Sequence, residues 1–181
     1  MKKPWHSCTS IEVPDWLLSE QNKLQSKKYL NDSSKMELVL YCAQRNVAER
    51  AGAPLAAAVF LYDGSLISIG VDAPGIGGHE MSNALLIASN VLGHGVLRAN
   101  RNWEFFSLAP PCLICQGNLF SERPGRFVCA ITHEDLTSEL ELPNTPFPNF
   151  NWVEHLNSRG IKVDAAISRE KGIEILKGMK S

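Results

Sequence analysis

The chain has 181 residues, 44% of them hydrophobic and 20% charged, and a formal net charge of −1. This length is enough for one sizeable core and favours one main domain. The near-zero charge gives no support for non-specific nucleic-acid binding, which depends on a basic surface. We expect no membrane partner, because no apolar run is long enough to span a membrane. We also expect no secretory signal in residues 1–15, which hold two lysines but no apolar stretch.

The five cysteines suggest a reducing compartment. Their number is odd, and Cys8, Cys42 and Cys129 have no spacing that indicates a disulfide framework. Thiols that remain reduced are typical of cytoplasmic proteins. The sequence therefore predicts a cytoplasmic protein.

The chain divides into an N-terminal extension over residues 1–32 and a domain over residues 33–181. A short helix is expected to begin near Pro14, with Trp16, Leu17 and Leu24 packing back on the domain. Helix-start residues at 31–34 then precede apolar residues at helical spacing, namely Met36, Val39, Leu40, Ala43, Val47 and Ala48. This pattern predicts a helix that ends at Gly52.

Strands and helices alternate through the rest of the chain. Residues 54–62 and 66–71 are predicted to form a hairpin around the Asp63-Gly64 turn. A Gly- and Pro-rich loop over 72–78 leads to a helix over 79–92. Further strands are expected at 103–108, 126–131 and 161–166, with helices at 113–120, 152–158 and 170–179. Residues 137–151 are rich in Pro, Asn and Glu and are expected to form a loop.

Cys112 and Cys115 are the clearest chemical signal in the sequence. They follow a predicted strand and Pro110-Pro111, and they lie at the start of a predicted helix. Cysteines three positions apart can turn both sulfurs to one point, which is a common zinc half-site. No second pair of this spacing exists to complete a four-cysteine site. Leu113-Ile114 also differs from the aromatic, Gly or Pro residues typical of redox-active pairs.

A third candidate ligand is His79, at the start of the helix predicted over residues 79–92. One imidazole and two thiolates leave a fourth zinc position open. That arrangement is typical of a catalytic zinc rather than a structural one. We therefore predict a Zn²⁺ site with His79, Cys112 and Cys115 as ligands.

The order of these elements and motifs resembles the zinc-dependent cytidine deaminase superfamily. A histidine opens one helix and Pro111-Cys112-x-x-Cys115 opens the next, similar to the signature of that superfamily. Within the superfamily, residues 53–59 are similar to the first strand of the guanine deaminase and tRNA adenosine deaminase branch. Residues 129–135 are similar to the strand exit of guanine deaminases. The resemblance spans about residues 34–179 and implies a three-layer α/β/α fold around a mixed five-stranded sheet.

The resemblance also implies an activity, the hydrolytic removal of an exocyclic amine from a purine or pyrimidine base. The substrate would be a small-molecule nucleobase or nucleoside. Zinc held by His79, Cys112 and Cys115 would lower the pKa of water, and a carboxylic acid would shuttle protons to the ring and to the leaving ammonia.

The sequence departs from the family at the proton shuttle. The family has a glutamate two residues after its histidine, where this chain has Met81. Glu80 is one residue too early, and a one-residue step turns a helical side chain by about 100°. Shifting the alignment would put Gly78, which has no ligand atom, in the ligand position. Glu80 is therefore either a relocated shuttle or a first-turn acid, and Met81 lines the pocket or fills the core.

Other candidate substrate-binding residues come from the loops. The run Gly70-Val71-Asp72 has an aspartate where the family often has an asparagine. Asp72 is therefore either an acceptor for a base amine or a turn residue. His94 and His133 are candidates for a pocket wall or for the surface.

Three functions fit this pattern. The first is an active deaminase, and the second is a catalytically silent partner or regulatory subunit that keeps a structural zinc. The third is a zinc hydrolase of another amidine. Relatives pair through helices beside the zinc site, so we also expect a homodimer that uses apolar surface from Leu113, Ile114, Leu119 and Phe120.

Overall fold

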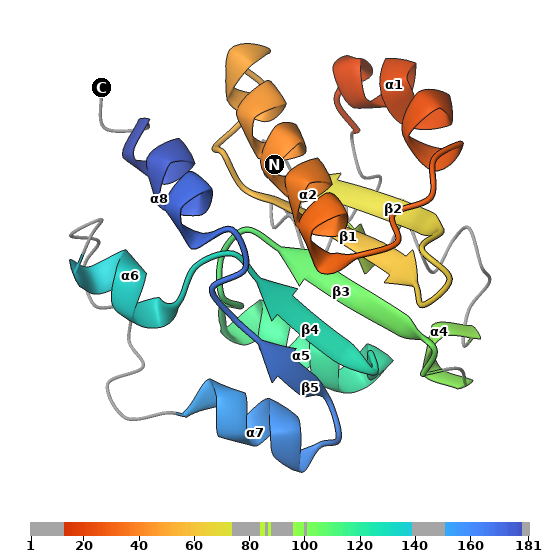
Figure 1. Cartoon of the computed structure of the whole chain (residues 1–181), viewed down its shortest axis with the longest axis vertical. Helices are drawn as coiled ribbons and strands as arrows, with labels where there is room; N and C mark the ends of the chain where they lie inside the picture. Colours follow the sequence, from red (N-terminus) through yellow and green to blue (C-terminus); the bar gives the residue numbers. More distant parts are fainter. Residues whose placement is uncertain are drawn as a thin grey trace, which may run out of the picture.

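The computed structural model describes residues 13–73, 84–85, 87, 96–99, 101–138 and 151–178. Five strands form one sheet, and helices lie on both of its faces (Figure 1). The strands are β1 (Ala56–Leu61), β2 (Leu66–Val71), β3 (Trp103–Ser107), β4 (Arg126–Cys129) and β5 (Lys162–Asp164). The helices are α1 (Asp15–Gln25), α2 (Asp32–Ala48), α4 (Val96–Ala99), α5 (Leu113–Glu122), α6 (His133–Ser138), α7 (Trp152–Ser158) and α8 (Arg169–Lys177).

The sheet is mixed, with the strand order β2-β1-β3-β4-β5. Strand β1 pairs antiparallel with both β2 and β3, whereas β3 pairs parallel with β4 and β4 parallel with β5. Parallel neighbours need a crossover connection, and α5 provides it between β3 and β4. All five predicted strands are confirmed, each at or within its predicted range.

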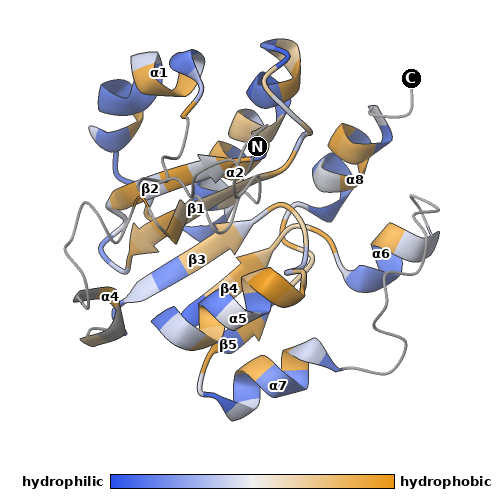
Figure 2. Cartoon of the chain, turned by 180° about the vertical axis from the view of Figure 1, so that it is seen from behind, coloured by the Kyte–Doolittle hydropathy of each residue, from blue (hydrophilic) through white to orange (hydrophobic). Residues whose placement is uncertain are grey.

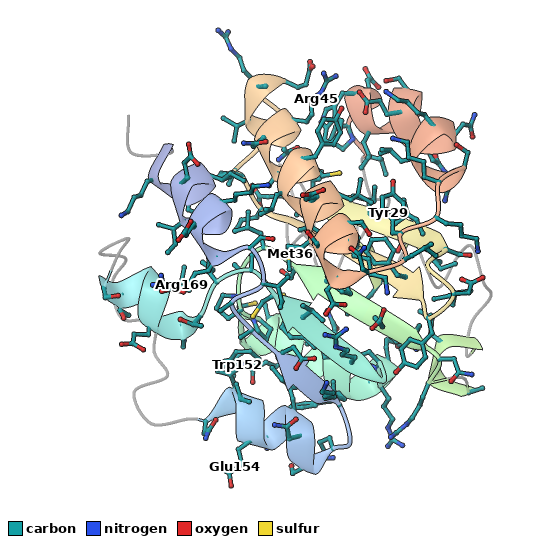
Figure 3. The ribbon with its side chains drawn as sticks, viewed as in Figure 1. Tyr29, Met36, Arg45, Trp152, Glu154 and Arg169 are labelled. Carbon is teal, nitrogen blue, oxygen red and sulfur yellow. The ribbon has the colours of Figure 1, made fainter. Side chains whose placement is uncertain are left out.

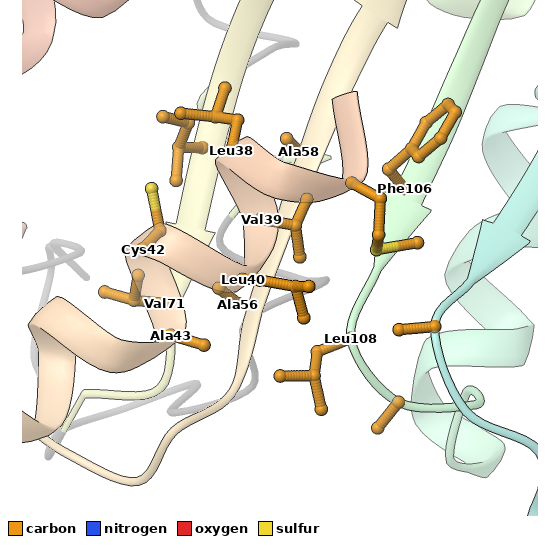
Figure 4. Packing of buried hydrophobic residues seen from close by; sticks show 14 of the residues in the cluster. Leu38, Val39, Leu40, Cys42, Ala43, Ala56, Ala58, Val71, Phe106 and Leu108 are labelled. Carbon is orange, nitrogen blue, oxygen red and sulfur yellow. The ribbon is translucent and has the colours of Figure 1, made fainter. Parts of the chain in front are cut away.

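Two hydrophobic clusters form the core, one on each face of the sheet. The first cluster packs α1, α2 and α8 against the sheet and includes Met36. Figure 4 shows part of this cluster, with Val39 of α2 and Phe106 of β3. The second packs α5 and α7 against the other face, with Phe105, Leu119 and Leu156. Apolar residues therefore concentrate on the strands and on the inner sides of the helices (Figure 2). These two layers around the sheet confirm the predicted three-layer α/β/α fold.

Helix α2 begins as the sequence predicts and ends earlier. The Asn31 side chain accepts a hydrogen bond from the Ser34 N–H at 2.8 Å, within a reciprocal capping box. The predicted end at Gly52 is wrong, because the helix ends at Ala48 and Arg50 takes a φ of 55°. Glycine is needed at position 52 because the backbone there passes close to that of Asp72. A Cβ at this position would lie 2.2 Å from the Asp72 carbonyl oxygen.

Helix α1 packs on the same core as α2, as the sequence predicts for its apolar residues. Trp16, Leu17 and Leu24 are all buried in the first cluster. The Arg45 guanidinium of α2 lies 5.8 Å from the centre of the Trp16 ring (Figure 3). Among the residues that the structure describes, no helix is long and apolar enough to cross a membrane.

A network of charged side chains lies where β3 and β4 begin. Glu104 and Arg126 stand directly opposite each other on β3 and β4, and their side chains are 3.1 Å apart. Arg126 also pairs with Asp32 at 2.6 Å and with Asp164 at 2.5 Å. Lys35 forms a buried ion pair with Glu104. These contacts tie the start of α2 to β3, β4 and β5.

Candidate active site

The two cysteines of the predicted half-site lie beyond the carboxyl end of β3. Pro110 and Pro111 precede them, and a helix rarely includes the residue before a proline. Helix α5 consequently begins only after Cys112, which is its extended N-cap with φ −68° and ψ 172°. The Gln116 side-chain amide donates to the Pro111 carbonyl at 3.1 Å and fixes the loop against the helix.

The Cys112 and Cys115 sulfurs lie 3.3 Å apart. That is much longer than a disulfide bond of about 2.05 Å. Two thiolates bound to a tetrahedral zinc at about 2.3 Å each would stand about 3.8 Å apart, so only a small adjustment separates the pair from such a geometry. Cys115 is 2% exposed and Cys112 is partly buried. The structure thus brings together the two soft donors that the sequence predicted, and this donor pair fits zinc.

The N-terminus of α5 favours the ionised form of these thiols. The Cys115 backbone N–H donates to the Cys112 sulfur at 3.5 Å. A helix N-terminus carries partial positive charge, which stabilises a thiolate. By contrast, burial raises the pKa of the Cys42 thiol and of the Cys129 thiol to about 12. Those two cysteines are therefore poor candidates for metal ligands.

His79, Glu80, Met81 and His94 lie outside the described residues. Zinc ligation by His79, the replacement of the shuttle glutamate by Met81 and the role of Glu80 therefore stay predictions. Within the residues that the structure describes, no three His, Cys, Asp or Glu side chains gather to form a metal site.

The segment that follows His79 packs in the same layer as the cysteines. Ala84 and Leu85 are helical and buried, as predicted, and they belong to the same hydrophobic cluster as Cys115. The Ser68 hydroxyl of β2 donates to the Ala84 carbonyl at 2.7 Å. This contact fixes the helix to the sheet five residues after the predicted histidine ligand.

Asp72 holds together the loop before β1 and the end of β2. Its Oδ2 accepts a hydrogen bond from the Ala53 N–H at 2.9 Å, and its carbonyl accepts one from Asn46 Nδ2 at 2.6 Å. The same Asn46 nitrogen donates to the Ala53 carbonyl at 2.9 Å. Asp72 thus has the structural role that the sequence offered as one alternative, and its contact with a base stays a prediction.

A second polar group, which the sequence analysis missed, lies beyond the carboxyl end of β4. Asp135 is buried and pairs with Arg169 at the start of α8 (Figure 3). Burial alone would raise the pKa of Asp135, but hydrogen bonds from Arg169 and Thr132 hold that pKa below its usual range. The pattern Thr132-x-x-Asp135 is a capping signature that could have identified α6. His133, in between, is partly buried, and its place on a pocket wall stays a prediction.

The exposed apolar residues beside the cysteines agree only in part with the expected dimer surface. Leu113 is 55% exposed and Ile114 is 59% exposed. Leu119 is fully buried in the core, so the expectation that it supplies surface is wrong. Phe120 is partly buried, and its ring packs edge-on against His155 with centres 4.6 Å apart.

Comparison with known proteins gives matches among solved structures alone. No family model matches the chain, and no curated protein matches its sequence. A variant of NE0047 bound to 8-azaguanine is 25% identical, with a TM-score of 0.83 and coverage of 97% of both chains. NE0047 bound to 2,6-diaminopurine is 28% identical, with a TM-score of 0.81 and coverage of 93% of this chain and 90% of that one.

The guanine deaminase of Nitrosomonas europaea is 26% identical, with a TM-score of 0.80 and coverage of 97% of this chain and 98% of that chain. These similarities support a place for the chain in the cytidine deaminase superfamily. A structure from work on tRNA:A34 deaminases shares the fold alone, at 19% identity and a TM-score of 0.55, over 78% of this chain and 97% of that one. The family resemblance drawn from the sequence therefore has independent structural support.

Proposed function

We propose that this chain is a zinc-dependent hydrolase that removes the exocyclic amine of a nucleobase or nucleoside. The observation that carries the proposal is the Cys112–Cys115 sulfur pair, 3.3 Å apart at the start of α5, within a deaminase-like fold. Purine bases are the first substrates to test, because a variant of NE0047 binds 8-azaguanine and NE0047 binds 2,6-diaminopurine.

Cys112 and Cys115 would hold the zinc together with His79. When bound, zinc supplies Lewis acidity that lowers the pKa of water to near neutrality. The chain itself keeps the two sulfurs at one point and stabilises their ionised form through the start of α5. Burial of Cys115 also keeps bulk water from one side of the site.

We assign substrate contacts and proton transfer to Asp72, Glu80 and Met81. Asp72 would accept a hydrogen bond from an amine or ring N–H of the base, because a carboxylate offers acceptors only. Glu80 would carry protons to the ring nitrogen and to the leaving ammonia, and Met81 would line the pocket. General acid–base assistance of this kind contributes about 10²–10⁴-fold in rate.

A silent deaminase-fold subunit is the second candidate function, and the methionine at position 81 favours it. If the shuttle place is empty, the zinc and the fold would serve a partner subunit. The chain would then release little or no ammonia from any base, although its metal remains bound.

One experiment separates the two candidates. Ammonia release from guanine, adenosine and cytosine would be measured for the native protein, for Glu80→Gln and for the double variant Glu80→Ala with Met81→Glu. Zinc content, measured in each sample, controls for loss of the metal site.

The two candidates give opposite results. An active enzyme that uses Glu80 has robust native turnover, and Glu80→Gln abolishes it while zinc stays bound. A silent protein has little native turnover, and the double variant gains activity if the pocket admits a base. Robust native turnover that survives Glu80→Gln would contradict both assignments and would move the shuttle to another group.

We also propose that the chain forms a homodimer through the exposed apolar residues Leu113 and Ile114. The family resemblance implies pairing beside the zinc site, and exposed apolar side chains next to one another favour association. Sedimentation at micromolar concentration would detect the dimer, and the double variant Leu113→Ser with Ile114→Ser should shift it to monomer. A native protein that sediments only as monomer would contradict the assignment.

A further inference from the structure

The two cysteines at the start of α5 differ in their access to solvent. Cys112 is partly exposed, whereas Cys115 is 2% exposed. Both are thiols in this structure, and their sulfurs lie 3.3 Å apart. In redox-sensitive pairs, an accessible cysteine reacts with the oxidant and a neighbouring cysteine then resolves the product to a disulfide. The difference in exposure gives Cys112 the first role and Cys115 the second.

We propose that this pair is also an oxidative modification site, at which hydrogen peroxide converts Cys112 and Cys115 into a reversible disulfide. The disulfide uses the two sulfurs that would hold the zinc, so its formation would switch off the deaminase. This consequence for activity rests on the proposed function, whereas the disulfide itself needs no metal. Peroxide is also smaller than the base that the site would admit, so a path for the base is a path for the oxidant.

The geometry prepares the two sulfurs for reaction with each other. A disulfide bond is about 2.05 Å long, so the sulfurs need to approach by only about 1 Å. Two hydrogen bonds from Gln116 hold the backbone that carries the pair. Its N–H donates to the Cys112 carbonyl at 2.8 Å, and its side-chain amide donates to the Pro111 carbonyl at 3.1 Å. The fixed helix start therefore keeps the second sulfur within reach of the first.

The reaction uses one peroxide for each pair of thiols. The Cys112 sulfur attacks a peroxide oxygen, so an S–O bond forms, the O–O bond breaks and one water leaves. The Cys115 sulfur then attacks the Cys112 sulfur, so the S–S bond forms, the S–O bond breaks and a second water leaves. Each thiol gives up one electron and one proton, and the peroxide takes up all of them as it is reduced to water.

Burial keeps the other two described cysteines out of this chemistry. Cys42 and Cys129 are 0% exposed, and burial raises the pKa of both thiols to about 12. A buried thiol that stays protonated is a poor nucleophile. Cys129 therefore provides a control position that has the same functional group without access to the oxidant.

Peroxide treatment of the full-length protein, followed by mass analysis of its peptides, tests the proposal. The peptide that contains Cys112 and Cys115 should lose two hydrogens, and dithiothreitol should restore them. Zinc content before treatment tests the proposed function separately, and each disulfide should release about one zinc. A disulfide that forms in protein purified without zinc would support the modification site and contradict the proposed zinc enzyme.

Two variants test the order of the steps. Cys115→Ser should stop at a sulfenic acid on Cys112, which a 1,3-dione reagent traps. Cys112→Ser should form neither product, because Cys115 is buried. Cys129→Ala is the matched control and should form the disulfide at the native rate. If a serine variant fails to fold, the native protein and Cys129→Ala still decide the proposal.

Three results would overturn the modification site. The native protein could keep both thiols under peroxide, or it could form only an irreversible sulfinic acid on Cys112. The disulfide could also join the Cys112 residues of two chains, which non-reducing electrophoresis would reveal as a covalent dimer.

Discussion

The two ends of the parallel strands β3 and β4 carry different kinds of polar group. At the amino ends, Glu104 and Arg126 belong to a network of ion pairs that joins the start of α2 to the sheet. Beyond the carboxyl ends come Cys112 after β3 and the Thr132–Asp135 turn after β4. Ligand sites of open α/β sheets lie outside the carboxyl ends of the strands.

The polar groups at the amino ends of the two strands therefore contribute to stability, and we expect those beyond the carboxyl ends to contribute to the chemistry of the site. The ions at the amino ends pair with one another, and these pairs hold the layers together. The sulfurs at the carboxyl ends lie side by side and fit a metal. Changes at one end should therefore alter stability, and changes at the other should alter metal content.

The largest expected effect is at the cysteine end. Purified protein should hold about one zinc per chain, and Cys112→Ser with Cys115→Ser should reduce this to near zero, because two of the three proposed ligands are lost. Cys129→Ala is the matched control, since the pKa of the Cys129 thiol is raised by burial and its loss should leave zinc in place. Elemental analysis gives the zinc content. A double serine variant with native zinc content would show that the ligands lie elsewhere.

The next largest effect should come from the buried ion pair at the amino ends. Lys35 and Glu104 have side chains that are 6% and 8% exposed. Lys35→Met leaves the buried Glu104 carboxylate with Arg126 as its remaining cation. Because an uncompensated buried charge costs about 3–5 kcal/mol, the loss in the free energy of unfolding should be at most of that order. Urea denaturation measures this change, and zinc content should stay native.

An exposed ion pair provides the control. Lys28 and Asp63 are 2.7 Å apart, but their side chains are 53% and 61% exposed. Lys28→Met should therefore change the free energy of unfolding by only about 0–1 kcal/mol. Equal losses for the Lys35 and Lys28 variants would contradict the view that burial gives the network its importance.

A smaller effect should appear as a pH dependence of stability. Hydrogen bonds from Arg126 hold the pKa of Asp32 below its usual range. The folded pKa is thus lower than the unfolded value of about 3.9, so the contribution is present above about pH 4 and is lost as the pH falls through the folded pKa. The stability difference between native protein and Asp32→Asn, from urea titrations, should shrink as the pH drops below about 4. A difference that grows in acid would contradict the assignment.

The smallest change in stability is expected at the C-terminal end of α5, the helix that connects the cysteines to β4. Arg123 follows α5 with a φ of 54°, a conformation that glycine adopts at less cost. Arg123→Gly should therefore raise the free energy of unfolding by no more than about 1 kcal/mol. Glu122→Gly, still within the helix, should lower it by about 0.5–1 kcal/mol. Thermal unfolding of both variants would reveal the opposite signs.

The sequence predicted the strands and the cysteine pair because both depend on local patterns. The hairpin follows from the Asp63-Gly64 turn, and the two sulfurs meet because they lie three residues apart at a helix start. The end of α2 was mispredicted, because Gly52 is required by a long-range contact with Asp72 rather than by the helix. The ion-pair network and the Asp135–Arg169 pair join residues that are distant in sequence, and such partners leave no local pattern.

The connection between β3 and β4 has a consequence for the rate of folding. Strands β1 and β2 pair across a short turn, whereas β3 and β4 pair only after α5 has crossed the sheet. Local pairings form faster than pairings that close long loops. We therefore expect that the β1–β2 hairpin is already formed in the transition state for folding and that β5, at the far edge, joins later. Substitutions in the hairpin should then slow folding, and those in β5 should mainly speed unfolding.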